Sequence, residues 1–263
     1  NGAGMSTSIR CLLGFETPTR GTASLLGHDA RDLPPSVRGD VAYVAEDQHL
    51  VRGMTGAQLQ AFHSATFPRF DTALFLDRVH RLRLPLDQRV RTFSRGQRAQ
   101  LALALAVATH PRVVVLDDPA LGLDTAVRRE FLDVVIDLIQ QTGNTVLFSS
   151  HLLGDVDRVA DRIAILHHGA LRVLGPLDAV KDAFRRVSAW FDDAAPTTLD
   201  VDGVFDVEPR GRELRLCVVG DVDRVLLHLE AMGGRRLTHG PLTLEDLFLA
   251  VTRQDVASPE PAR

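Results

Sequence analysis

Four short runs of apolar, largely β-branched residues constrain the fold of this chain more than any other feature of the sequence. They are Val41–Val44, Val113–Leu116, Thr145–Phe148 and Arg162–Leu166. Runs without a regular polar position are typical of strands that are covered on both faces, as in parallel sheets. Helical patterns alternate with them, at Ser6–Leu13 and Thr125–Gln141. The alternation predicts an α/β core with a mainly parallel sheet.

The long stretch between the first and second of these strands predicts a helical subdomain inserted at about residues 52–110. Within it, Leu101–Ala106 alternates in size like a strand, yet it consists of leucine and alanine, which are strong helix formers. We therefore expect a helix, with Ser94 as its N-cap and Pro111 ending the run before the next strand.

The pattern changes after Gly169. Leu171–Leu174 is expected to pair back as a hairpin, and residues 187–252 predict a small α+β appendage. Its expected strands and helices are Val187–Phe191, Glu213–Val219, Val222–Met232 and Leu244–Val251. Residues 253–263 contain two prolines and few apolar side chains, which predicts a disordered tail.

Composition excludes several classes of protein. The 263 residues are 45% hydrophobic and 24% charged, as in ordinary globular domains. The longest apolar run, Leu101–Ala108, is far shorter than the roughly 18 residues of a membrane-spanning candidate. The net charge of -4 gives no general reason to bind nucleic acid. With two cysteines, Cys11 and Cys217, we expect a reducing compartment, the cytosol by default.

The first chemical motif is Asn1-Gly2-Ala3-Gly4-Met5-Ser6-Thr7, which leads directly into a helix. Glycines there let backbone N–H groups converge on an anion, and the positive end of the helix dipole favours a phosphate. Taken alone, the motif more often marks a glycine turn before a helix.

The second motif is a pair of acids, Asp117-Asp118-Pro119, at the carboxyl end of a buried strand. Ligands bind at that end in open α/β sheets. Asp117 is placed to hold Mg²⁺ directly or through water, and Asp118 to orient or deprotonate an attacking water. The alternative, a solvated turn, is common for one aspartate and less so for two. His167 and His168 adjoin another strand end, where neighbouring side chains point to opposite faces, so they predict no metal chelate.

The ordered motifs resemble the ATP-binding subunit of an ABC transporter over residues 1 to about 175. They are the opening glycine loop, Phe93-Ser94-Arg95-Gly96-Gln97, Leu116-Asp117-Asp118-Pro119, Gly122-Leu123-Asp124 and Ser150-His151. Three segments further resemble the ATPase subunits of bacterial ABC-2 type exporters: Phe67–Asp71, Arg91–Gln97 and Thr243–Phe248. The resemblance implies a P-loop NTPase cassette over residues 1–180, the appendage at 187–252, and ATP and Mg²⁺ as cofactors.

The resemblance also implies roles for individual residues. The nucleotide-binding loop would comprise Asn1, Gly2, Ala3, Gly4, Met5, Ser6 and Thr7, with Ser6 and Asp117 as Mg²⁺ ligands. Asp118 and His151 would be catalytic, His151 by contacting the γ-phosphate. Ser94, Gly96 and Gln97, the signature segment, would complete the nucleotide site of an opposite subunit, and Asp124 would link the two sites.

Three positions depart from the family pattern. Met5 stands where the family has the P-loop lysine, and a thioether cannot donate charge-assisted hydrogen bonds to phosphate. Lys181, the only lysine, is no obvious substitute, and nothing places Arg10 or Arg20 there. Asp118 replaces the usual glutamate. The family's usual glutamine between the first strand and the helical subdomain, an expected Mg²⁺-site residue, falls on Glu46, with Gln48 as the runner-up.

We also expect the amino end to be truncated, because the first glycine of the loop and the strand feeding it would precede Asn1. The predicted function is ATP binding and hydrolysis that powers export through a separate membrane permease. A second cassette is the other expected partner, nucleic acid is not, and the location is the cytoplasmic face of the plasma membrane.

The sequence leaves two alternative functions open. One is a hydrolysis-impaired nucleotide-binding regulatory subunit, which Met5 and Asp118 favour. The other is a soluble ABC ATPase of translation or DNA repair. Such proteins tend to carry a second cassette or a long coiled-coil insertion, and neither pattern is present in this sequence.

Overall fold

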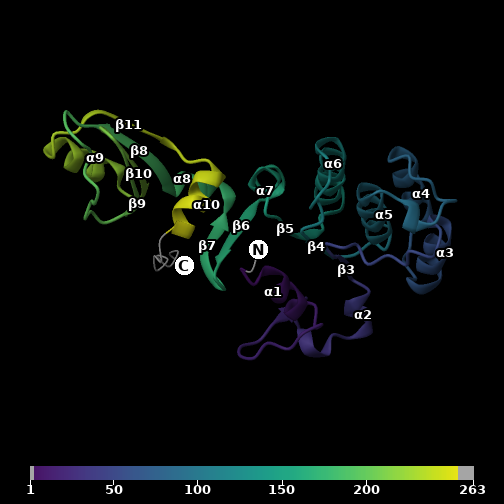
Figure 1. The fold of residues 1–263 in the computed structure, drawn as a ribbon. Helices are drawn as coiled ribbons and strands as arrows, with labels where there is room; N and C mark the ends of the chain where they lie inside the picture. Colours follow the sequence, from purple (N-terminus) through teal and green to yellow (C-terminus); the bar gives the residue numbers. More distant parts are fainter. Residues whose placement is uncertain (1–2, 254–263) are drawn as a thin grey trace. The chain divides into compact units, whose positions relative to one another are not determined.

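A computed structural model describes residues 3–253 as two compact units (Figure 1). Met5–Val159 form one, and Ala3 and Gly4 join the residues from Ala160 onward in the other. Each unit is described by itself below. The division of the sequence into a cassette of residues 1–180 and an appendage of residues 187–252 stays a prediction.

A parallel sheet lies at the centre of the unit Met5–Val159. It contains β3 (Val41–Val44), β4 (Val113–Asp117) and β5 (Thr145–Ser149), in the order β3-β4-β5. All three strands were predicted, and their parallel pairing confirms the expected core. The register places Asp117 opposite Ser149, so the carboxyl ends of β4 and β5 meet.

The two faces of this sheet are covered by different helices. Val113 and Val115 of β4 pack with Ile9 and Val37, from α1 (Met5–Leu12) and α2 (Pro35–Arg38). Val114 and Leu116 point the other way and pack against α5 (Arg95–Val107) and α6 (Thr125–Thr142). Burial on both faces explains why β4 has no exposed position.

Three helices of the predicted insertion pack together: α3 (Gly56–Thr66), α4 (Thr72–Arg81) and α5. Leu101 and Leu105 of α5 face α3 and α4, whereas Leu103 and Val107 face the sheet. The helix is therefore apolar around most of its circumference, which explains its strand-like alternation. Ser94 is its N-cap in a capping box with Gln97, as predicted.

The remaining elements of this unit are short, apart from α6. They are β1 (Ser24–Leu25), β2 (His28–Asp29), a 3₁₀ turn at Ala30–Asp32, another at Val90–Thr92, and α7 (Leu153–Val159). Helix α7 follows β5 directly and is tied to α6 by two ion pairs, Arg128–Asp155 and Arg158–Asp133.

The second unit begins with the predicted hairpin, formed by β6 (Arg162–His167) and β7 (Ala170–Pro176). Helix α8 (Leu177–Ala183) leads to an antiparallel sheet of order β11-β8-β10-β9. Its strands are β8 (Phe184–Trp190), β9 (Val204–Arg210), β10 (Glu213–Val219) and β11 (Arg235–Pro241). The sequence pattern had indicated β8 and β10 but not β9 and β11.

Two helices cover this antiparallel sheet. Leu214 and Leu216 pack with α9 (Val222–Ala231), while Cys217 packs with Ala250 of α10 (Leu244–Arg253). Both helices confirm the expected α+β pattern. Residues 254–263 of the predicted disordered tail lie outside the described residues. Across residues 3–253, no helix combines the length and the apolar character needed to cross a bilayer.

Candidate functional site

The carboxyl ends of β4 and β5 are joined by hydrogen bonds around Asp117. The Ser149 hydroxyl donates to Asp117 Oδ1 at 2.9 Å, and the backbone N–H of Asp118 donates to Ser149 Oγ at 2.8 Å. Both Asp117 and Ser149 are buried, with 5% and 4% of their surface exposed. Because paired buried polar groups have few alternative positions, these bonds fix the Asp117 carboxylate.

Helix α1 brings a second hydroxyl to the same carboxylate. Ser6 lies in its first turn, and its Oγ donates to Asp117 Oδ1 at 3.1 Å, a contact between residues 111 positions apart. The packing of Ile9 and Leu13 with Val113 and Val115 holds α1 against β4 and so sets this distance. The first turn of α1 and the tip of β4 thus form one polar site.

Asp118 is paired with His151. Its Oδ2 lies 2.7 Å from His151 Nδ1, and its Oδ1 is buried without a hydrogen-bond partner in the described residues. The backbone of Asp118 has a positive φ of 44°, which few residues other than glycine, asparagine and aspartate adopt. The turn after β4 therefore aims the carboxylate at the loop after β5.

The pKa of Tyr43 reports on the same region. Burial of the Tyr43 side chain raises the pKa of its hydroxyl, and the negative charge of Asp117 raises it further. Tyr43 lies on β3 next to β4, so the neutral phenol is the form that this site favours.

Met5 leaves this site without a lysine at the start of α1. Its side chain is partly buried and packs against the apolar cluster that contains Ile9 and Val115. No ion pair joins an arginine to Asp117 or Asp118 among residues 3–253. Arg10, one candidate substitute, pairs with Glu16 at 2.8 Å instead.

The predicted signature segment lies where α5 meets the turn before α6. A Cβ on Gly96 would stand 2.7 Å from Val127 Cγ1, so glycine allows the two helices to approach. Arg95 lies over Gly122, whose hypothetical Cβ would be 3.0 Å from the guanidinium. Asp124 is the N-cap of α6, accepting from the N–H groups of Ala126 and Val127.

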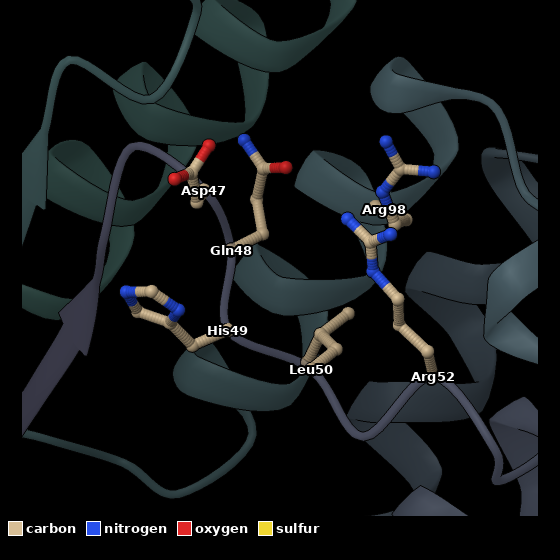
Figure 2. A pocket seen from close by; sticks show the side chains of 6 residues that line it. All are labelled: Asp47, Gln48, His49, Leu50, Arg52 and Arg98. Carbon is tan, nitrogen blue, oxygen red and sulfur yellow. The ribbon is translucent and has the colours of Figure 1, made fainter.

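The loop after β3 forms a pocket, shown in Figure 2, that is lined by Asp47, Gln48, His49, Leu50, Arg52 and Arg98. Gln48 is buried, has a φ of 49°, and its amide donates to the Glu46 carbonyl at 2.6 Å. Glu46 is exposed, and its carboxylate makes no bond to Asp117 in the part of the chain that is described. The choice between Glu46 and Gln48 stays a prediction.

The structure thus brings together Ser6, Asp117, Asp118 and His151 out of the predicted site residues. Thr7 is exposed next to Ser6, while Asn1 and Gly2 lie outside the described residues. Ala3 is partly buried, and Gly4 has a φ of 90°, a conformation that suits glycine. Ser94, Gly96, Gln97 and Asp124 make no bond to the acids. Ser149 was missed, although its place at the end of the strand next to β4 was a usable signal.

His167 and His168 contradict one expectation. Their ring centroids are 4.1 Å apart, so the two side chains do not point to opposite faces. The reason is that β6 ends at His167 and the chain turns at His168, with a φ of 48°. Across residues 3–253, no cluster of three or more His, Cys, Asp or Glu side chains is arranged to hold a metal ion.

The donor set around Asp117 fits Mg²⁺ bound together with a phosphate. Ser6 Oγ and the Asp117 carboxylate are hard oxygen donors within 3.1 Å of each other. Mg²⁺ usually takes one or two protein oxygens and fills its other positions with water and substrate phosphate. The unpartnered Oδ1 of Asp118 is an acceptor that a bound water would satisfy.

Comparisons with known proteins show which proteins this chain resembles. A family model described as ABC transporter matches residues 1–121. The chain is 23% identical to the ABC transporter ATP-binding protein YtrB of Bacillus subtilis, over 95% of this chain and 85% of that protein. It is 28% identical to Nod factor export ATP-binding protein I of Neorhizobium galegae, over 97% of this chain and 76% of the other.

A third relative is the daunorubicin/doxorubicin resistance ATP-binding protein DrrA of Streptomyces peucetius. It is 33% identical over 70% of this chain and 57% of its own length. Among solved structures, an ATP-binding subunit of an ABC transporter matches 69% of this chain and 78% of its own, with a TM-score of 0.61 and 27% identity. A dimeric ATP-binding cassette with ADP and phosphate matches 66% and 81%, with a TM-score of 0.58 and 20% identity, and supports the fold alone.

Proposed function

We propose that this chain, which belongs to the ABC transporter family of ATP-binding subunits, binds and hydrolyses ATP to drive export through a separate membrane permease. The observation that carries the site assignment is the 3.1 Å contact between Ser6 Oγ and Asp117 Oδ1. It places the start of the helix after the glycine loop at the strand-end acids, as a site for magnesium-bound triphosphate requires.

Each residue of the site has a distinct task in this proposal. The N–H groups at the start of α1 bind the phosphates, and Ser6 with Asp117 would hold Mg²⁺, which supplies positive charge to the phosphate oxygens. Asp118 accepts a hydrogen bond from the attacking water through its unpartnered Oδ1. His151 is held at Nδ1 by Asp118, which leaves Nε2 to face the γ-phosphate.

A second cassette completes the site. The signature segment Ser94, Gly96 and Gln97 would contact the nucleotide of the opposite subunit, and Asp124 would lie between the two sites. ATP then favours the closed pair because it binds that state better than the open one. The permease would receive this motion at the cytoplasmic face of the membrane, beside the loop of Glu46 and Gln48 whose pocket Figure 2 shows.

Met5 favours a second candidate, a subunit that closes on ATP but scarcely hydrolyses it and pairs with an active cassette. Its side chain is packed in the apolar cluster under α1, so it supplies no charge to the phosphates. A hydrogen bond from a charged group is worth about 1.5 to 3 kcal/mol, and its absence matters most where charge moves during transfer.

Three measurements on the same preparation separate these candidates. Calorimetry with Mg²⁺ and ATP tests binding, and sedimentation with and without ATP tests pairing. Phosphate release in a single turnover then tests hydrolysis. Binding with release supports the ATPase, and binding and pairing without release support the regulatory subunit. A protein that takes up no nucleotide would remove both.

A further inference from the structure

Asp155 is a buried carboxylate close to the candidate site that has no role in the function proposed above. It lies in the first turn of α7, four residues after His151, and only 6% of its surface is exposed. One of its oxygens, Oδ2, has no hydrogen-bond partner in residues 3–253. A buried carboxylate with an unsatisfied oxygen is costly for the folded state, so its presence calls for an explanation.

The closest opposite charge comes from α6. Arg128 Nε lies 3.6 Å from Asp155 Oδ1, and the Arg128 side chain is largely buried. Arg128 is one helical turn after Asp124, and its N–H donates to the Asp124 carbonyl at 2.9 Å. A rigid helical turn therefore connects the N-cap residue Asp124 to the cation that faces Asp155.

His151 is the other group that Asp155 influences. Burial raises the pKa of Asp155, while the positive charges of Arg128, His151 and Arg158 lower it and the negative charge of Asp118 raises it. Asp155 thus lies within electrostatic range of both members of the His151–Asp118 pair. The segment that connects His151 to Asp155 is short, because α7 begins at Leu153. Within it the Leu152 N–H donates to Ser150 Oγ at 3.0 Å.

Simple docking of α7 on α6 does not require this buried charge. The same two helices share a second ion pair, Arg158 with Asp133, at 2.5 Å. Both side chains of that pair are more than a third exposed, so it costs little desolvation and contributes little. The two pairs differ in burial: Asp155 is buried and lies within electrostatic range of His151, whereas Asp133 is exposed.

We infer that Arg128 and Asp155 are a positioning pair that holds the loop of His151 so that its ring stays against Asp118 and faces the γ-phosphate. Through Arg128 the pair also connects this loop to Asp124, the residue proposed to lie between two cassettes. The inference rests on the proposed function, because it assigns His151 to the γ-phosphate of bound ATP.

The test is the preference of the full chain for ATP over ADP, measured by calorimetry with Mg²⁺. Only ATP carries the phosphate that His151 would contact, so a displaced ring lowers ATP affinity and leaves ADP affinity unchanged. For Asp155→Asn and Arg128→Gln we expect the preference to fall roughly tenfold, the lower end of the effect of removing an outer-shell partner. Asp133→Asn is the matched control on the same two helices and should keep the preference of the unaltered chain.

A double-mutant cycle separates positioning from folding. In a His151→Ala background, Asp155→Asn should cause no further loss of preference, because the ring that it positions is gone. Thermal unfolding of each variant identifies any that fails to fold, and Arg128→Gln tests the pair from the other helix in that case. An unchanged preference in both variants, or an equal loss in Asp133→Asn, overturns the inference. No ATP binding by the unaltered chain would instead count against the proposed function.

Discussion

The two sides of the candidate site are built in different ways. On the strand side, Asp117, Asp118, Ser149 and His151 form a continuous hydrogen-bond network with distances of 2.7 to 2.9 Å. On the helix side, α1 contributes the hydroxyl of Ser6, but Met5 turns into the apolar cluster beneath it. One side is a preorganised set of acceptors, and the other lacks the cation that the family places there.

This difference shows that binding and turnover place separate demands on one site. Holding Mg²⁺ with a phosphate needs oxygen donors and backbone N–H groups, which are present at Ser6, Asp117 and the start of α1. Transfer of the phosphate also needs positive charge where negative charge develops. The site keeps the elements for the first demand and has lost one element for the second.

Restoring the cation should have the largest effect. For Met5→Lys we expect single-turnover ATP hydrolysis to rise by roughly 30-fold to several thousand-fold, the range for one charged partner of a buried anion. Met5→Leu is the control, since it keeps the apolar packing under α1 and adds no charge. If Met5→Lys binds ATP normally and stays as slow as the unaltered chain, the assignment of Met5 to the lysine position fails.

Damage to the strand side should come next in size. In the Met5→Lys background, Asp118→Asn removes the charge that we propose orients an attacking water and should slow hydrolysis by at least about a hundredfold. ATP binding should be nearly unaffected, because Asp118 is not among the proposed Mg²⁺ ligands. Asn can keep a hydrogen bond to His151 and adopts positive φ readily, so the turn after β4 should survive. Equal rates with and without the substitution would exclude Asp118 as the residue that orients water.

Much of this contrast could be predicted from the sequence. The apolar strands and the acids that follow one of them located the site at a strand end, and the resemblance supplied Ser6 and His151. The loss of the cation was also visible, because the sequence shows Met5 directly. The position of the Met5 side chain could not be predicted, because it packs against residues as distant in the sequence as Val115.

Other features depend on three-dimensional proximity that no local pattern records. Ser149 looked like an ordinary serine until the parallel register placed it opposite Asp117. The strands β9 and β11 contain proline, glycine and several charged residues, which hide the alternation that identifies a strand. Asp155 gave no signal at all, because its burial follows from how α7 packs and not from its neighbours in sequence.

Helix docking beside the strand side should have a smaller effect than either change in the site. Gly96→Ala places a Cβ 2.7 Å from Val127 Cγ1, so the Val127 side chain or one of the helices α5 and α6 must shift. We expect a loss of about 1 to 2 kcal/mol in the free energy of unfolding, as for other overpacked contacts. Gly154→Ala is the matched control, because its Cβ meets no atom within 4 Å. In that helix alanine should instead add about 0.5 to 1 kcal/mol. Denaturant unfolding measures both, and equal shifts would refute the crowding at Gly96.

The smallest expected effect concerns the pH dependence of stability. It tests whether the buried charge on the strand side lowers the free energy of unfolding. Burial raises the pKa of Asp155 above its ordinary value of 3.8. As pH rises from that value, the unfolded chain ionises first, so ionisation of Asp155 favours unfolding until the pH passes its folded-state pKa. The stability contributed by the protonated form is therefore complete below 3.8 and is lost as the pH rises. Asp155→Asn does not titrate, so its stability relative to the unaltered chain should increase from pH 4 to neutrality.

Denaturant unfolding of both proteins at several pH values gives that difference in stability. If this difference in stability does not change with pH, Arg128 fully compensates the buried charge of Asp155. The strand side and the helix side of the site would then differ in chemistry but not in their electrostatic cost to stability.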